Sequence, residues 1–132
     1  MKWEEMTPDE RNMLIARRGM GLQVWRGTLH LNNTPTGEAL LYCEGPDGGR
    51  LGLPAYTTDI VAARLVEDEI ERRGLVDAYI DALAVLIDPN GNDISIFDTI
   101  IEMNGRRALW ALLRATPEQR CWAALRAMGV EV

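Results

Sequence analysis

The stretch GLPAYTTDIVAARLVEDEIERRG, residues 52–74, is the most regularly patterned part of the chain. A helical period places one apolar stripe in it, made of Ala62, Ala63, Val66 and Ile70. The charged run VEDEIERR then lies on the solvent side, and the glycine at residue 74 ends the pattern. The sequence therefore predicts an amphipathic helix from about residue 58 to residue 73.

Two apolar residues of this helix lie outside its main stripe. Val61 and Leu65 are four residues apart, so they form a second ridge on another side of the helix. This ridge either packs under a loop or meets another protein chain.

The four residues Tyr56-Thr57-Thr58-Asp59 stand at the start of the same helix and admit two interpretations. The first turn of a helix has unpaired backbone N–H groups and partial positive charge, so the tyrosine and the two threonine hydroxyls could hold an anionic or amide-bearing ligand. In the other interpretation a threonine or Asp59 caps the free N–H groups, and no ligand is needed.

Two further helices have strong start signals. Thr7-Pro8-Asp9-Glu10 and Thr116-Pro117-Glu118-Gln119 both combine a capping box with proline at the first helical position. The first helix is expected to end at Gly19 and the second at Gly129.

Between the first two helices, residues 22–53 are expected to form short β-strands with turns. LQVWRGTLHL alternates apolar and polar residues, which places Trp25 and Arg26 on opposite faces. The clusters NNTPTG and EGPDGG are typical of turns.

Two Asn-Gly pairs predict a three-stranded meander over residues 78–88, 93–103 and 106–115. Both faces of this meander are apolar, so helices must cover both. The fold class is therefore expected to be α+β, as a three-layer α/β/α sandwich with a mainly antiparallel sheet. The segment 106–115 also has the Ala and Leu content of a helix, so its assignment stays open.

Length and charge limit the classes of function. The 132 residues fit a single domain, 1–132, and the net charge of −6 argues against a nucleic-acid partner. No apolar run is long enough for a membrane helix, and MKWEEMTPDER does not resemble a signal peptide. We therefore expect no membrane association and a cytoplasmic location. Cys43 and Cys121 lack the spacing of a zinc or redox motif.

Enzymatic chemistry finds little support in the sequence. His30 is the only histidine, and the glycines of GPDGGRLGL match neither a phosphate loop nor a dinucleotide fingerprint. Asp81 and Asp98 would lie close together on one face of the predicted meander, yet solvated carboxylates at a sheet margin are the simpler interpretation. We expect no catalytic residue, no metal and no cofactor.

Two segments, PAYTTDIVAARLVEDEI and ATPEQRCWAALRAM, resemble the phage ABA sandwich domain family. Thr57 stands where serine is common in that family, and Trp122 replaces the usual arginine. The positions that fit are Tyr56, Thr58, Asp59, Ile60, Ala62 and Ala63 in the first motif and Cys121, Ala123, Ala124 and Leu125 in the second. The resemblance implies a three-layer α/β/α fold, a bacteriophage or prophage origin and hence the host cytoplasm. It carries over no catalytic residue.

These observations predict a non-enzymatic phage accessory protein that acts in counter-defence. It would bind and sequester a small nucleotide-like ligand as a homo-oligomer, at a site made of Tyr56, Thr57, Thr58, Trp25 and Arg26. The alternative is a protein-binding inhibitor or adaptor of a host protein, with Val61 and Leu65 in an exposed apolar patch. A metal-dependent hydrolase using Asp81, Asp98 or His30 is the third and weakest hypothesis.

Overall fold

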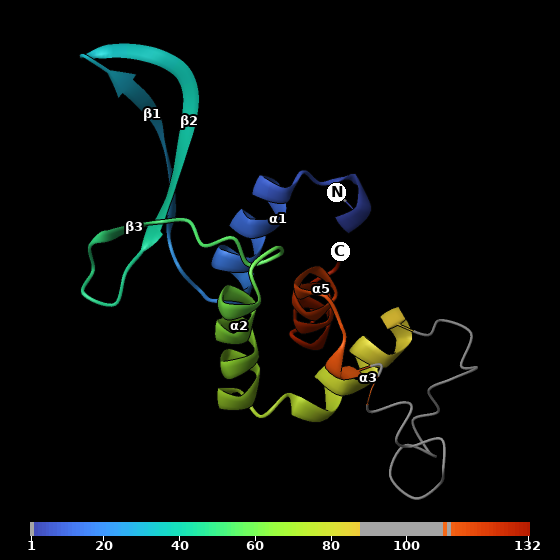
Figure 1. Ribbon diagram of the computed structural model, residues 1–132. Coiled ribbons are helices and arrows are strands. Elements are labelled where there is room, and N and C mark those ends of the chain that lie inside the picture. Colours follow the sequence, from blue (N-terminus) through green and yellow to red (C-terminus); the bar gives the residue numbers. More distant parts are fainter. Residues whose placement is uncertain (1, 88–109, 111) are drawn as a thin grey trace, which may run out of the picture.

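The computed structural model describes residues 2–87, 110 and 112–132 (Figure 1). A short 3₁₀ helix, η1, comes first, and α1 continues directly into one π-helical turn, η2. A three-stranded sheet and three further helices follow. The bounds are η1 Trp3–Glu5, α1 Pro8–Leu14, η2 Ile15–Gly19, β1 Val24–Leu31, β2 Thr34–Glu44, β3 Arg50–Gly52, α2 Ile60–Arg72, α3 Val76–Ile87 and α5 Pro117–Ala127.

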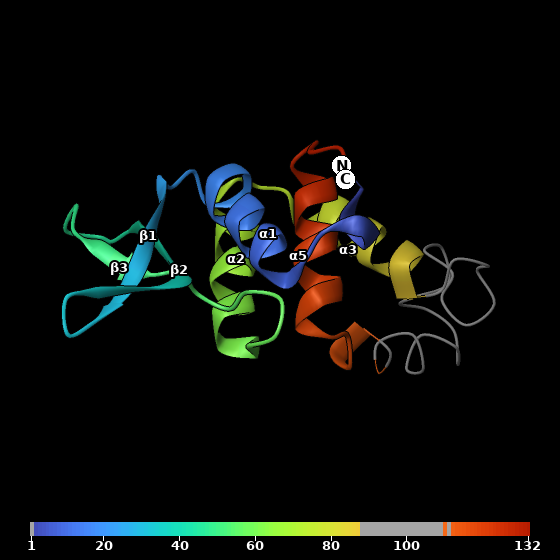
Figure 2. The ribbon, with the colours of Figure 1, turned by 90° about the horizontal axis from the view of Figure 1, so that it is seen from above.

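Helix α5 lies in the middle of a helical bundle. It packs against α2, α3 and η2, and both views show it between these helices (Figures 1 and 2). Four of its residues are completely or almost completely buried: Cys121, Ala123, Ala124 and Leu125. The small alanine side chains allow neighbouring helices to approach closely. The stripe predicted on α2, Ala62, Ala63, Val66 and Ile70, is buried against this core, as expected.

The sheet projects from one end of the bundle (Figures 1 and 2). Its order is β1-β2-β3, with both pairs antiparallel. Asn32 and Asn33 make the turn between β1 and β2, both with positive φ, as a two-residue hairpin requires. Among the described strand residues, only Val24 packs around the main core cluster, and Cys43 of β2 is also buried. The sheet is therefore an arm and not a layer of the core.

The local helix signals are confirmed. Thr7 and Thr116 accept hydrogen bonds from the backbone N–H groups of Glu10 and Gln119, at 3.2 and 3.1 Å, in two complete capping boxes. At the end of α2, Gly74 has φ +71°, and the Leu75 N–H donates to the Ile70 carbonyl at 3.0 Å. This bond is typical of the glycine-ended helix that the sequence predicts.

The predicted meander is wrong where the structure describes it. Residues 78–87 belong to helix α3 and not to a strand, and Trp110, Leu112 and Leu113 are helical. The segment VDAYIDALAVLI is rich in the good helix formers Ala and Leu, and helix propensity prevails over its weak alternation. The middle strand 93–103 and both Asn-Gly pairs lie outside the described residues.

The fold class α+β is confirmed, whereas the sandwich layering is not shown. Within the described parts of the chain, helices gather on one side of the molecule and the sheet extends from the other (Figure 2).

Candidate functional site

Tyr56, the first predicted site residue, lies inside the helical core with 1% of its surface exposed. Its backbone carbonyl accepts a hydrogen bond from the Cys121 thiol of α5 at 3.2 Å. Burial raises the pKa of the Tyr56 phenol to about 12, with smaller contributions from Cys43 and Cys121. The side chain is therefore a neutral core residue in this conformation.

Thr57 is also buried, and it is held by Asn12 of α1. The Thr57 backbone N–H and hydroxyl both donate to Asn12 Oδ1, at 3.1 and 3.0 Å. Both residues are largely inaccessible to solvent. These two bonds join the loop before α2 to α1 and satisfy polar groups that burial would otherwise penalise.

Asp59 is the residue that caps α2. Its carboxylate accepts the Val61 backbone N–H at 2.9 Å, while Thr58 is exposed and its own N–H donates to the Ala55 carbonyl at 3.1 Å. The capping interpretation thus has direct geometric support. Of the four residues at this helix start, Tyr56 and Thr57 are in the core, and only Thr58 and Asp59 reach solvent.

The other two predicted site residues lie in the sheet. Trp25 is half-buried and stands opposite Tyr42 of β2, with the Arg50 guanidinium carbon 4.8 Å from its ring centroid. Arg26 follows Trp25 in the strand, so its side chain leaves from the opposite face. The cation beside Trp25 is therefore Arg50 and not Arg26. The structure does not gather the five predicted residues into one site.

An apolar ridge follows the outward side of α2. Val61, Leu65 and Ile60 expose 68%, 47% and 39% of their surfaces. At 100° per residue, Val61 and Leu65 point away from the stripe that packs on α5. The second ridge predicted from the sequence is therefore a solvent-facing surface, and α2 lies at the end of the helical bundle from which the sheet projects (Figures 1 and 2).

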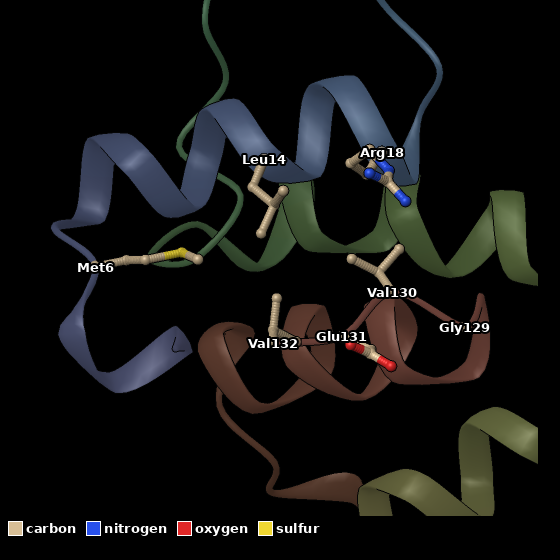
Figure 3. A pocket seen from close by; sticks show the side chains of 7 residues that line it. All are labelled: Met6, Leu14, Arg18, Gly129, Val130, Glu131 and Val132. Carbon is tan, nitrogen blue, oxygen red and sulfur yellow. The ribbon is translucent and has the colours of Figure 1, made fainter. Parts of the chain in front are cut away.

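A pocket with a volume of about 450 Å³ lies between α1 and the C-terminal segment (Figure 3). Leu14 points down from α1 towards Val130 and Val132, and Met6 closes one end (Figure 3). Its lining is Met6, Leu14, Arg18, Gly129, Val130, Glu131 and Val132. Sequence reasoning missed this pocket because it joins residues from both ends of the chain.

A second, more apolar groove of about 270 Å³ lies along α1 and shares two of these residues. It is lined by Met6, Glu10, Met13, Leu14 and Arg17. Neither groove includes any of the five predicted site residues. The signal that could have revealed part of the second groove is the spacing of Glu10, Met13 and Leu14, which places them on one side of α1.

His30 and Asp81, two residues named for the hydrolase hypothesis, lie on different elements of the described part of the chain. His30 is exposed, and its Nδ1 lies 2.9 Å from the Thr28 carbonyl. Asp81 is exposed on α3, and Asp98 lies outside the described residues. Within residues 2–87, 110 and 112–132, His, Cys, Asp and Glu nowhere gather in a group of three or more that could hold a metal ion.

Both thiols are poor nucleophiles in this environment. Cys121 has no exposed surface, and burial raises the pKa of its thiol to about 12, with smaller contributions from Glu67 and Glu118. Burial also raises the pKa of the Cys43 thiol. Reactive cysteines need the opposite shift, towards the thiolate.

Comparisons with protein families, curated proteins and solved structures find no match to this chain. The resemblance to the phage ABA sandwich family therefore stays a prediction from the quoted motifs. Across the described part of the chain, every helix is too short or too polar to cross a membrane.

Proposed function

We propose that this protein is a non-enzymatic binding protein that attaches to another protein through the outward ridge of α2, which is made of Val61 and Leu65. The observation that carries the proposal is the exposure of two large apolar side chains, Val61 and Leu65, one turn apart on the same side of one helix. A single exposed apolar residue needs no explanation, but a cluster is typical of an interaction site.

The neighbourhood of the ridge supports this choice. Asp59 caps the helix, and Ala62, Ala63, Val66 and Ile70 fix its other side in the core. The ridge is therefore presented by a helix with a defined orientation, which reduces the entropy lost on binding. An apolar helix face of this kind suits an apolar groove or helix on the partner.

Sequestration of a nucleotide-like ligand is the second candidate, and one observation favours it. Arg50 lies over Trp25 on the sheet, so an aromatic surface and a cation are adjacent. A base could stack on the ring while the guanidinium meets a phosphate. Such a site would be made of Trp25 and Arg50. Tyr56 and Thr57 are buried and would not belong to it.

The phage origin, the role in counter-defence and the host cytoplasm remain proposals based on the resemblance alone. The same holds for the three-layer arrangement. Helices of a partner that covered the faces of the sheet would supply the missing layers, and the arm described above leaves those faces open to them.

Site-specific photo-crosslinking tests the protein-binding proposal. A photoreactive residue at Leu65 should give a discrete crosslink to one host protein, and Val61→Asp in the same chain should remove it. The matched control carries the photoreactive residue at Asp77, which is exposed on α3. Equal crosslinking from both positions, or crosslinking that survives Val61→Asp, would show that the ridge is not the binding surface.

A further inference from the structure

We propose that the protein forms a symmetric homodimer in which α1 of one protomer packs antiparallel on α1 of its partner. This inference concerns a different surface from the α2 ridge and does not depend on the proposed function. It rests on the groove along α1 and on the order of charges within it.

Four of the five side chains of this groove form one stripe. Glu10, Met13, Leu14 and Arg17 are separated by three, one and three residues, the spacing of a single helix side, whereas Met6 precedes α1 in extended backbone. Arg17 belongs to the π-helical turn η2, yet it lines the same groove as Glu10 and Met13. Met13 is half-buried and is not among the side chains packed around the core, so part of its surface faces the groove.

The stripe is self-complementary about a twofold axis. A twofold axis that passes between Met13 and Leu14 pairs each residue of one protomer with a residue of its partner. The numbers of the two paired residues add to 27. Glu10 then faces Arg17 of the partner subunit, and Met13 faces Leu14 of the partner subunit. By symmetry each contact occurs twice, as an isologous interface requires. Methionine is unbranched and adapts well to such a contact.

The charges are available for these contacts. Arg17 is exposed and makes no ion pair with any residue that the structure describes. Within the described residues, the Glu10 carboxylate accepts the Thr7 backbone N–H at 3.3 Å and no other donor, so it has lone pairs left for a guanidinium. Antiparallel packing also sets the two helix dipoles in opposite directions, which is favourable.

A second copy fits the groove better than other occupants do. Along the helix, the carboxylate of Glu10 and the guanidinium of Arg17 flank the apolar side chains of Met13 and Leu14. A purely acidic or purely basic peptide would therefore meet a like charge at one end. An antiparallel copy of α1 presents the opposite charge at both ends.

The interface is small, which sets the conditions of the test. Stable interfaces bury roughly 800 Å² on each partner, and the five side chains of this groove cover less than this. The dimer should therefore be weak, and sedimentation velocity should cover protein concentrations from about 1 μM to about 1 mM.

Charge reversal provides a decisive experiment. Glu10→Lys and Arg17→Glu each place like charges opposite one another, so each variant alone should dimerise at least about tenfold more weakly than the unchanged protein. An equimolar mixture of the two variants restores both opposite-charge contacts and should dimerise again. So should the double variant Glu10→Lys/Arg17→Glu.

Two controls separate this effect from misfolding. Glu71→Lys changes an exposed carboxylate on α2 and should leave dimerisation unchanged. Glu10→Gln keeps a side chain that can complete the capping box and should weaken the dimer without loss of helical circular dichroism. An unchanged protein that is monomeric at about 1 mM would overturn the proposal, because even a weak specific interface is populated there. Folded single variants that fail to associate in the mixture, or that dimerise as well as the unchanged protein, would also overturn it.

Discussion

At the scale of single residues, Asn12 connects two segments that lie far apart in the chain. Its side-chain oxygen accepts two hydrogen bonds from Thr57, and both residues are buried. A buried donor without a partner costs more than the bond itself contributes, because the donor has lost its water. Asn12 should therefore matter more to stability than Thr57.

This asymmetry gives a first prediction. Asn12→Ala leaves both Thr57 donors unpaired and should lower the free energy of unfolding by about 2–3 kcal/mol, whereas Thr57→Val removes one donor and should cost only about 1 kcal/mol. Urea denaturation followed by circular dichroism measures both values. Equal costs for the two variants would contradict the role given to Asn12.

The second prediction at the scale of residues concerns the pH dependence that Glu69 gives to stability. Arg72 and Arg73 of the same helix donate hydrogen bonds to Glu69, and Arg73 also reaches the Gly19 carbonyl at 2.8 Å. The bonds from Arg72, then those from Arg73, lower the pKa of Glu69 to about 2. Since the folded pKa lies below the unfolded value, the stabilisation is complete above about pH 4.5 and is lost as the pH falls towards 2.

Glu69→Gln should therefore lower the free energy of unfolding by about 1 kcal/mol at pH 7, and the difference should shrink between pH 4.5 and pH 2. Urea titrations of both proteins across this range test it. A difference that is constant with pH would mean that the charge of Glu69 contributes nothing.

The residue scale also shows what the sequence could not predict about the candidate site. Tyr56 and Thr57 have the composition of an open binding loop, and nothing within a few residues marks them as buried. Their partners, Asn12 and Cys121, are 45 and 65 residues away. Burial of such residues depends on tertiary packing, which local patterns do not contain.

At the scale of elements, helices with complete local signals were predicted well. α1, α2 and α5 each combine a start signal with a glycine stop, and α2 also has an unambiguous apolar stripe. α3 has no clear cap, and its only charged residues, Asp77 and Asp81, interrupt an otherwise largely apolar segment. Such a segment fits a strand or a buried helix equally well, and its packing against α5 decides the outcome.

The prediction at the scale of elements concerns the contribution of the cap of α2 to stability. Asp59→Ala removes the cap and should cost about 1 kcal/mol, while Asp59→Asn keeps an acceptor and should cost only a few tenths of a kcal/mol. Thermal unfolding of both variants measures the difference. If neither variant changes stability, the Val61 N–H bond is not what holds the helix start.

At the scale of the whole molecule, the packing of the sheet is the feature that the sequence could not predict. Its strands were expected from alternation and turn residues, and this expectation is confirmed. What they pack against could not be predicted, because short strands with glycine-rich turns give no information on long-range contacts. The faces of the arm and the α2 ridge are left open, and these are the surfaces that a partner can cover.

The central claim is that this protein acts by binding another protein through α2. Native mass spectrometry of protein purified from bacterial host cells tests it most directly, with the Val61→Asp/Leu65→Asp variant as the comparison. The claim predicts a complex with one host protein for the unchanged chain and its loss for the folded variant. A stoichiometric small molecule, bound equally by both chains and without a protein partner, would contradict it and favour the Trp25–Arg50 site.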